Sequence, residues 1–115
     1  MLTEKEYCDY ETCVALSEQG CPMIKKGYLG LSLYSAQKWL REEKQMLVIP
    51  LIFADNLIDE DGKIVGRWKY YSFAIYSTST AEFIRNYDQG EEYDSYEEAL
   101  LEGIKEAIKI LKEEK

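Results

Sequence analysis

The residues best suited to chemistry are three cysteines near the N-terminus. Cys8, Cys13 and Cys21 are separated by five and eight positions, and the chain contains no histidine. Structural zinc takes four ligands, usually with cysteines paired at Cys-x(2–4)-Cys spacing. The neighbouring side chains are mostly carboxylates, which do not lower the pKa of a thiol as a cation would. The pattern therefore favours three free thiols that pack as small apolar groups, over a metal site or a nucleophile.

Acidic residues gather in two further places. Those at 55–61 resemble a loose cation-binding loop, but Gly62 is misplaced for an EF-hand and no glutamate closes the loop. Those at 91–94 could supply paired carboxylates for glycosidase chemistry, although a solvated loop before a helix is the simpler interpretation. Without histidine the chain lacks the usual general base. We therefore predict no catalytic residue, no cofactor and no bound metal, and a protein that is not an enzyme.

Aromatic residues offer a surface instead of a reaction. The chain has ten tyrosines and two tryptophans, residue types that are enriched at protein interfaces. Within the segment 67–76, strand alternation places Trp68 and Tyr70 on one face and Tyr71, Phe73 and Ile75 on the other. One face would meet the helices and the other a partner, although these rings could also only fill and rim a small core. The predicted interaction surface consists of Trp68, Tyr70, Tyr76, Tyr87 and Tyr93.

Composition limits the functions open to the chain. Its 115 residues, 46% hydrophobic and 31% charged, fit a single domain over 1–115. A net charge of −8 disfavours nucleic acid and anionic membranes as partners. The longest apolar run, 46–54, is about half the length that a membrane span needs. Free cysteines and the lack of a signal peptide indicate the cytoplasm.

Two helices are predicted in the first half. Asp9 and Gly20 are suited to begin and end a helix over 10–19, and Tyr10, Cys13, Leu16 and part of Val14 would form its inward face. Ser32 is suited to cap a second helix that runs to about Lys44. Its buried face is predicted to consist of Leu33, Ala36, Trp39 and Leu40.

Strands follow in the middle of the chain. The run 46–53 favours a strand, and Pro50 places that strand at a sheet edge or at a bulge. A turn at 59–62 and a second strand over 67–76 complete an antiparallel hairpin. A third short strand is predicted within 81–87.

The last helix carries the strongest local signals. Ser95 and Glu98 have the spacing of a capping box, and apolar residues follow at the period of one helical face. Gly103 lies on that face, where it predicts a close approach of the helix backbone to the sheet. The fold class is therefore α+β, in the order α-α-β-β-(β)-α, with a small antiparallel sheet of two to three strands packed in two layers with helices.

Three segments together resemble a known group of proteins. They are Asp9-Tyr-Glu-Thr12 followed by Gly20, Gln37-Lys-Trp-Leu-Arg-Glu42, and Ser95-Tyr-Glu-Glu-Ala99 followed by Glu102, Gly103, Glu106 and Ala107. In order and spacing they are similar to motifs of small uncharacterised proteins carried by phages, prophages and other mobile elements of anaerobic gut bacteria. The resemblance implies an accessory protein in a bacterial cytoplasm, and it transfers no catalytic residue.

Two functional hypotheses follow. In the first, the chain acts by protein–protein interaction, with another protein or as a homodimer, through an aromatic sheet face or the edge strand that contains Pro50. In the second, it is an acidic DNA mimic or an inhibitor of a host nucleic-acid enzyme, which requires carboxylates gathered on one face and spaced like phosphates.

Overall fold

The computed structural model describes residues 6–22, 31–85 and 92–113. Its elements follow the order α-α-β-β-β-α, so the predicted α+β class and element order are confirmed. They are α1 (Tyr10–Glu18), α2 (Leu33–Glu43), β1 (Met46–Ile58), β2 (Ile64–Ser77), β3 (Phe83–Arg85) and α3 (Tyr96–Glu113). The strands form one antiparallel sheet in the order β1-β2-β3. β1 is therefore an edge strand, which is one of the two alternatives that Pro50 predicted.

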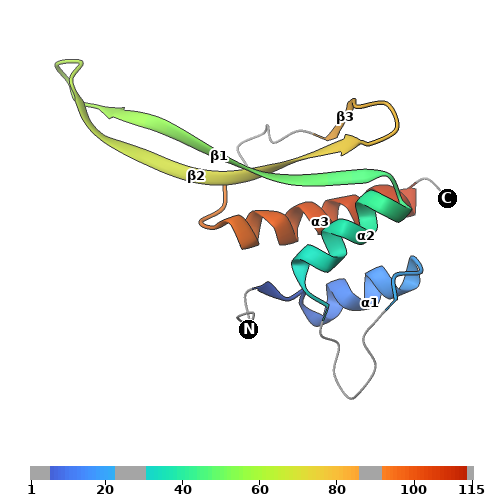
Figure 1. Ribbon diagram of the computed structural model, residues 1–115. Helices are drawn as coiled ribbons and strands as arrows, with labels where there is room; N and C mark the ends of the chain where they lie inside the picture. The colour runs from blue at the N-terminus through green and yellow to red at the C-terminus, as the bar shows by residue number, and fades with distance from the viewer. Residues whose placement is uncertain (1–5, 23–30, 86–91, 114–115) are drawn as a thin grey trace.

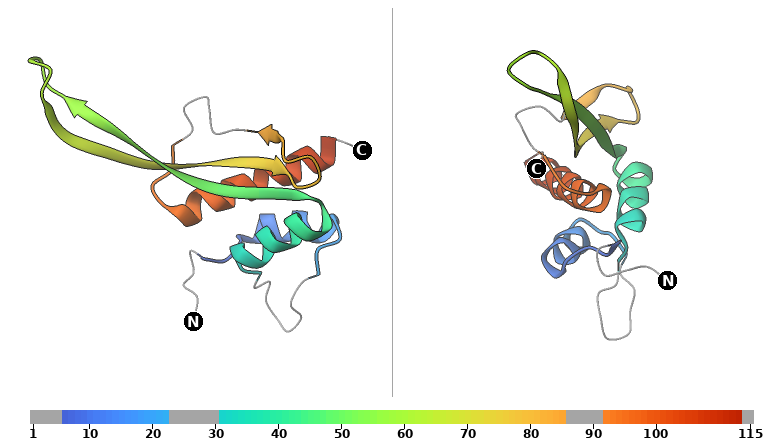
Figure 2. Two further views of the ribbon diagram at one scale, coloured as in Figure 1. Left: turned by 45° about the horizontal axis from the view of Figure 1, so that its top comes forward. Right: turned by 90° about the vertical axis from the view of Figure 1, so that its left-hand side faces the viewer.

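The helices lie on one side of the sheet (Figure 1). α3 packs against β1 and β2, α2 packs against β1, and α1 lies beyond them, on the side away from the sheet (Figure 2). The core runs between the sheet and α3 and then between the helices. Its largest fully buried side chains include Leu16, Leu33, Leu40, Val48, Ile75, Leu100 and Ile104.

Capping side chains begin each helix at the predicted residue. The Asp9 carboxylate accepts a hydrogen bond from the backbone N–H of Thr12 at 2.8 Å, and the Ser32 hydroxyl accepts one from Ser35 at 3.0 Å. At α3 the Ser95 hydroxyl accepts from the N–H of Glu98 at 3.1 Å. The return bond of this capping box goes one residue further back than expected, because the Glu98 carboxylate accepts from the N–H of Asp94 at 3.3 Å.

The inward face of α1 differs from the prediction at Tyr10, which is 70% exposed. Cys13 and Leu16 are buried as predicted, and Thr12 is buried in place of Tyr10. At about 100° per residue, these three positions centre on a direction roughly 110° away from Tyr10. The spacing of the apolar residues therefore allowed two inward faces, one that includes Tyr10 and one that includes Thr12. In the structure, α1 packs against α3 through the face that includes Thr12.

Both long strands extend further than predicted. β1 continues five residues past Phe53, and β2 begins at Ile64 rather than at Arg67. The two strands pair along this whole length, from Met46↔Ser77 to Ile58↔Ile64, with an irregularity between Leu57 and Ile58. β3 begins at Phe83, two residues after the start of its predicted range, and residues 86 and 87 of that range lie outside the described residues. Ala81, at a φ of 62°, turns the chain just before the strand begins.

Candidate interaction surface

The distal half of the β1–β2 hairpin projects beyond the helices (Figures 1 and 2). We call residues 54–69 the arm. All of them are exposed except Asp59 and Gly66, which are half-buried, so no arm residue belongs to the buried core. The arm lengthens the molecule to 58 × 35 × 19 Å, with a radius of gyration of 16.5 Å. A compact domain of this length would have a radius of about 13 Å.

The tip of the arm is a tight turn built by Asp59. The Asp59 carboxylate accepts hydrogen bonds from the N–H groups of Asp61 and Lys63, both at 2.9 Å. Gly62 has a φ of 82°, a conformation that suits glycine. Asp59 therefore serves the turn, while Asp55 lies in β1 opposite Trp68. The described part of the chain contains no group of three or more acids, cysteines or histidines placed to hold a metal ion.

Aromatic rings in contact with one another form one face of the hairpin at the base of the arm. Tyr70 lies between Phe53, at 5.4 Å between ring centroids, and Trp68, at 5.3 Å. We call these three residues the aromatic face. Phe53 and Tyr70 are half-buried, while Trp68 is 46% exposed. Because Phe73 and Ile75 alternate with them on β2 and are buried in the core, the aromatic face points away from the helices.

The opposite face of the arm is apolar and basic. Ile58 and Ile64 are 62% and 63% exposed, and Ile52, just before the arm, is 57% exposed on the same face. Alternation along β2 places Arg67 and Lys69 on this same face. A two-stranded ribbon without a covered face is marginally stable in water. The arm therefore carries large apolar side chains that contribute nothing to the core of this chain.

The predicted interaction residues fall into three groups. Trp68 and Tyr70 lie together on the aromatic face, and Tyr76 lies on the same side of the sheet, stacked on Phe83 at 4.5 Å. Tyr93 lies on the helix side, where it stacks on Phe73 at 6.2 Å and pairs through its backbone with Tyr71. Tyr87 is outside the described residues. Sequence reasoning missed Phe53 as a member of the surface, although its apolar neighbours at 51 and 52 marked the strand.

The three cysteines are free and buried, and they belong to the hydrophobic core. Burial is the largest cause that raises the pKa of each thiol, and it brings the pKa of Cys8 to about 12. Neighbouring Cys13 and Asp9 act in the same direction on Cys8. A thiol held protonated at neutral pH is a poor nucleophile, and all three cysteines pack in the hydrophobic core as small apolar side chains.

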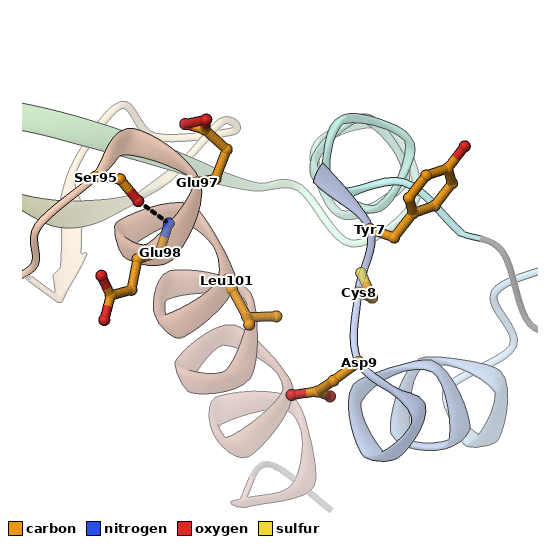
Figure 3. Close-up of a pocket in the computed structure, with 7 residues that line it drawn as sticks. All are labelled: Tyr7, Cys8, Asp9, Ser95, Glu97, Glu98 and Leu101. Carbon is orange, nitrogen blue, oxygen red and sulfur yellow. Dashed lines mark hydrogen bonds between the residues drawn. The ribbon is translucent and has the colours of Figure 1, made fainter. Parts of the chain in front are cut away.

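A cavity of about 510 Å³ opens between the start of α3 and the segment that leads into α1 (Figure 3). Leu101 and Cys8 contribute apolar wall, and Asp9, Glu97 and Glu98 contribute carboxylates. Three of its polar groups have structural roles: Ser95 caps α3, Glu98 accepts a hydrogen bond from the N–H of Asp94, and Asp9 caps α1 and pairs with Lys105 at 3.4 Å.

Asp9 gives a first testable result. Partial burial acts to raise its pKa, but hydrogen bonds from Thr12 and the charge of Lys105 outweigh it, so the pKa lies below the ordinary 3.8. Asp9→Ala should lower the free energy of unfolding by about 1 kcal/mol at pH 7. The ionised cap stabilises the fold above the unfolded-state pKa, so the difference should shrink as pH falls below about 4.

Chemical denaturation at pH 7 and near pH 3 measures this difference. Asp9→Asn is the matched control, because asparagine caps helices as well as aspartate does but does not titrate. An Asp9→Ala penalty that is the same at both values of pH would contradict the role of the ionised carboxylate.

Comparisons with protein-family models, with curated proteins and with solved structures found no match to this chain. Within the described residues, no helix is both long enough and apolar enough to cross a membrane. The arm and its aromatic face are thus the features of the chain itself on which a functional hypothesis can be based.

Proposed function

We propose that this chain is a non-enzymatic binding module that contacts another protein through the aromatic face of its arm. The observation that carries the proposal is the exposure of Trp68, 46% of whose surface is open, on an arm that covers no core. Large exposed apolar side chains lower the solubility of a free monomer. A two-stranded ribbon with no covered face is only marginally stable. Burial against a partner would remove both costs.

The aromatic face has the chemistry of an interface centre. Trp and Tyr supply most of the binding energy in many interfaces, because they bury large areas with little loss of side-chain entropy. Here contact with Tyr70, whose own ring stacks on Phe53, restrains the ring of Trp68 before any partner arrives. Preorganised rings lose less conformational entropy on binding. We therefore assign the central contact to Trp68.

Comparative affinity capture tests this proposal. The wild-type chain and Trp68→Ser are immobilised in parallel and exposed to a lysate of the organism that encodes the chain. A partner that binds through Trp68 should be retained by the wild type, and its affinity for Trp68→Ser should fall at least about 30-fold. Titration of the purified partner against both chains then measures the ratio.

Ile64→Ser is the matched control. Ile64 is 63% exposed on the same arm, and it pairs with Ile58 on the face opposite Trp68. Its replacement removes a comparable exposed apolar side chain but should leave partner affinity within about threefold. If Trp68→Ser binds like the wild type, or if Ile64→Ser loses the partner equally, the aromatic face is not the binding surface.

The biological setting remains a prediction from the sequence. Resemblance of three segments to small proteins of phages and other mobile elements supports an accessory protein that acts in a bacterial cytoplasm. A DNA mimic would need a carboxylate face without cations. On the arm, Lys63, Arg67 and Lys69 are interspersed with the acids, which favours protein recognition there over mimicry of a phosphate backbone.

A further inference from the structure

Main-chain groups along the free edge of β1 point away from the sheet at every second residue. Tyr71 forms two backbone hydrogen bonds with Tyr93, at 2.9 and 2.8 Å, on the outer side of β2. Its neighbour across the hairpin is Ile52. Two residues opposite each other in an antiparallel pair either exchange main-chain hydrogen bonds or both direct their N–H and C=O groups away from each other. Ile52 therefore directs its N–H and C=O to the free edge. By alternation Val48, Ala54 and Asn56 do the same, and Pro50 directs its carbonyl there.

The end of this edge nearest the helices is already blocked. The Gln37 side chain of α2 donates a hydrogen bond to the carbonyl of Val48 at 2.6 Å, which also confirms that Val48 faces outward. Pro50, the next outward residue, has no N–H to donate. Charged side chains and prolines at such places are how sheets prevent unwanted pairing. Among the described residues, the outward groups of Ile52, Ala54 and Asn56 have no such cover.

The other edge of the arm is guarded in a different way. By the same alternation, Arg67 and Lys69 of β2 direct their N–H and C=O groups outward. Lysine and arginine at an edge oppose the approach of a second strand. The three outward residues of β1, by contrast, are uncharged. The arm therefore has one edge protected by cations and one edge open to pairing.

From these two edges we infer that the chain forms a homodimer in which β1 pairs antiparallel with β1 of a second copy, around a two-fold axis at Ala54. This inference rests on the proposed function, because the dimer would enlarge the aromatic surface that we assign to partner binding. It joins Ala54 with Ala54, and Ile52 with Asn56 in both directions. These three outward pairs exchange two main-chain hydrogen bonds each, the pattern of strand addition at a sheet edge.

The edge is complementary to itself, which favours a second copy over an unrelated strand. Across the axis, Phe53 would face Asp55 and Leu51 would face Leu57, so no like charges lie opposite each other.

Dimerisation would complete the surface assigned to partner binding. Joined edges place the two hairpins in one continuous sheet, with strands in the order β2-β1-β1-β2. On one face of that sheet a row runs from Tyr70 and Phe53 of one copy to Asp55 and Trp68 of the other. The two aromatic faces thereby become one platform, and a partner would contact rings from both copies.

A proline scan of the arm tests the pairing. Ala54→Pro removes an outward N–H and should weaken dimerisation at least about 100-fold, without breaking a bond between β1 and β2. Lys69→Pro is the matched control, because Lys69 lies directly opposite Ala54 and faces the other edge. Light scattering after size exclusion should give about twice 13.4 kDa for the wild type and Lys69→Pro, and a monomer for Ala54→Pro.

Hydrogen exchange of the wild-type chain gives a readout that does not depend on a variant. The amides of Ile52, Ala54 and Asn56 should be protected in the dimer and lose protection on dilution, while those of Arg67 and Lys69 exchange fast throughout. A wild-type monomer at about 100 μM, or a dimer that Ala54→Pro leaves intact, would overturn the inference. Capture through Trp68 by a monomeric wild type would overturn the dimer alone and leave the proposed function standing.

Discussion

Replacing Gly103 with alanine should destabilise the fold by about 1–3 kcal/mol, although alanine favours the helix itself by about 1 kcal/mol. A Cβ atom at Gly103 would lie 2.5 Å from Cγ1 of Val48 and 3.1 Å from Cγ of Phe73. Both neighbours are buried, and Val48 is β-branched, so neither can move aside freely. Urea denaturation monitored by tryptophan fluorescence measures this loss in the free energy of unfolding.

A double-mutant cycle with Val48→Ala shows whether this contact is the cause. Removing the Val48 methyl groups costs stability by itself, because it leaves a cavity. It also provides the room that a Cβ at Gly103 requires. The double variant should therefore be more stable than the sum of the two single losses, by at least about 1 kcal/mol. Simple additivity, or a Gly103→Ala variant more stable than the wild type, would contradict the close approach.

Gly103 was predictable because its signal is local. A glycine on the apolar face of an otherwise good helix has few explanations other than close packing. The caps at Asp9, Ser32 and Ser95 were predictable for the same reason, since a capping side chain bonds within three residues of itself. Each of these predictions is confirmed by contacts within or directly beneath one helix.

The arm was not predictable from the same kind of signal. Strand recognition relies on β-branched residues and on alternation between a buried and an exposed face. Ala54, Asp55 and Asn56 are poor strand formers, and both faces of the arm are exposed, so no alternation marks it. Pairing with β2 extends β1 through this stretch, and that contact is invisible in the sequence of either strand alone.

Tyr93 illustrates a second limit. Its sequence neighbours are acidic, and the prediction therefore placed it at the surface with Tyr87. Hydrogen bonds with Tyr71 instead align it beside β2 and direct its ring toward Phe73. A partner 22 positions away in the chain decided its side of the sheet, and no local pattern reports such a partner.

Replacing residues 54–69 with Asn-Gly should abolish partner binding and leave the rest of the chain folded. Phe53 and Tyr70 are opposite each other and, by the alternation found at Ile52, form a hydrogen-bonded pair. Such a pair is the correct frame for a two-residue type I′ turn, for which Asn-Gly is the preferred sequence. Thermal unfolding should change by no more than a few degrees, because the removed residues bury no core and the loop becomes shorter.

The loss of binding in this variant would be specific to the arm. The replaced segment contains four acidic and three basic residues, so the net charge changes by only one. Nonspecific electrostatic attraction therefore stays nearly constant. Trp68→Ser, which keeps the whole arm, distinguishes the contribution of the Trp68 ring from that of the rest of the arm. A shortened chain that still binds the partner would locate the interface on the helical body. A shortened chain that fails to fold would show that the arm stabilises the rest of the sheet. The exposed part of the hairpin would then belong to the same cooperative folding unit as the core.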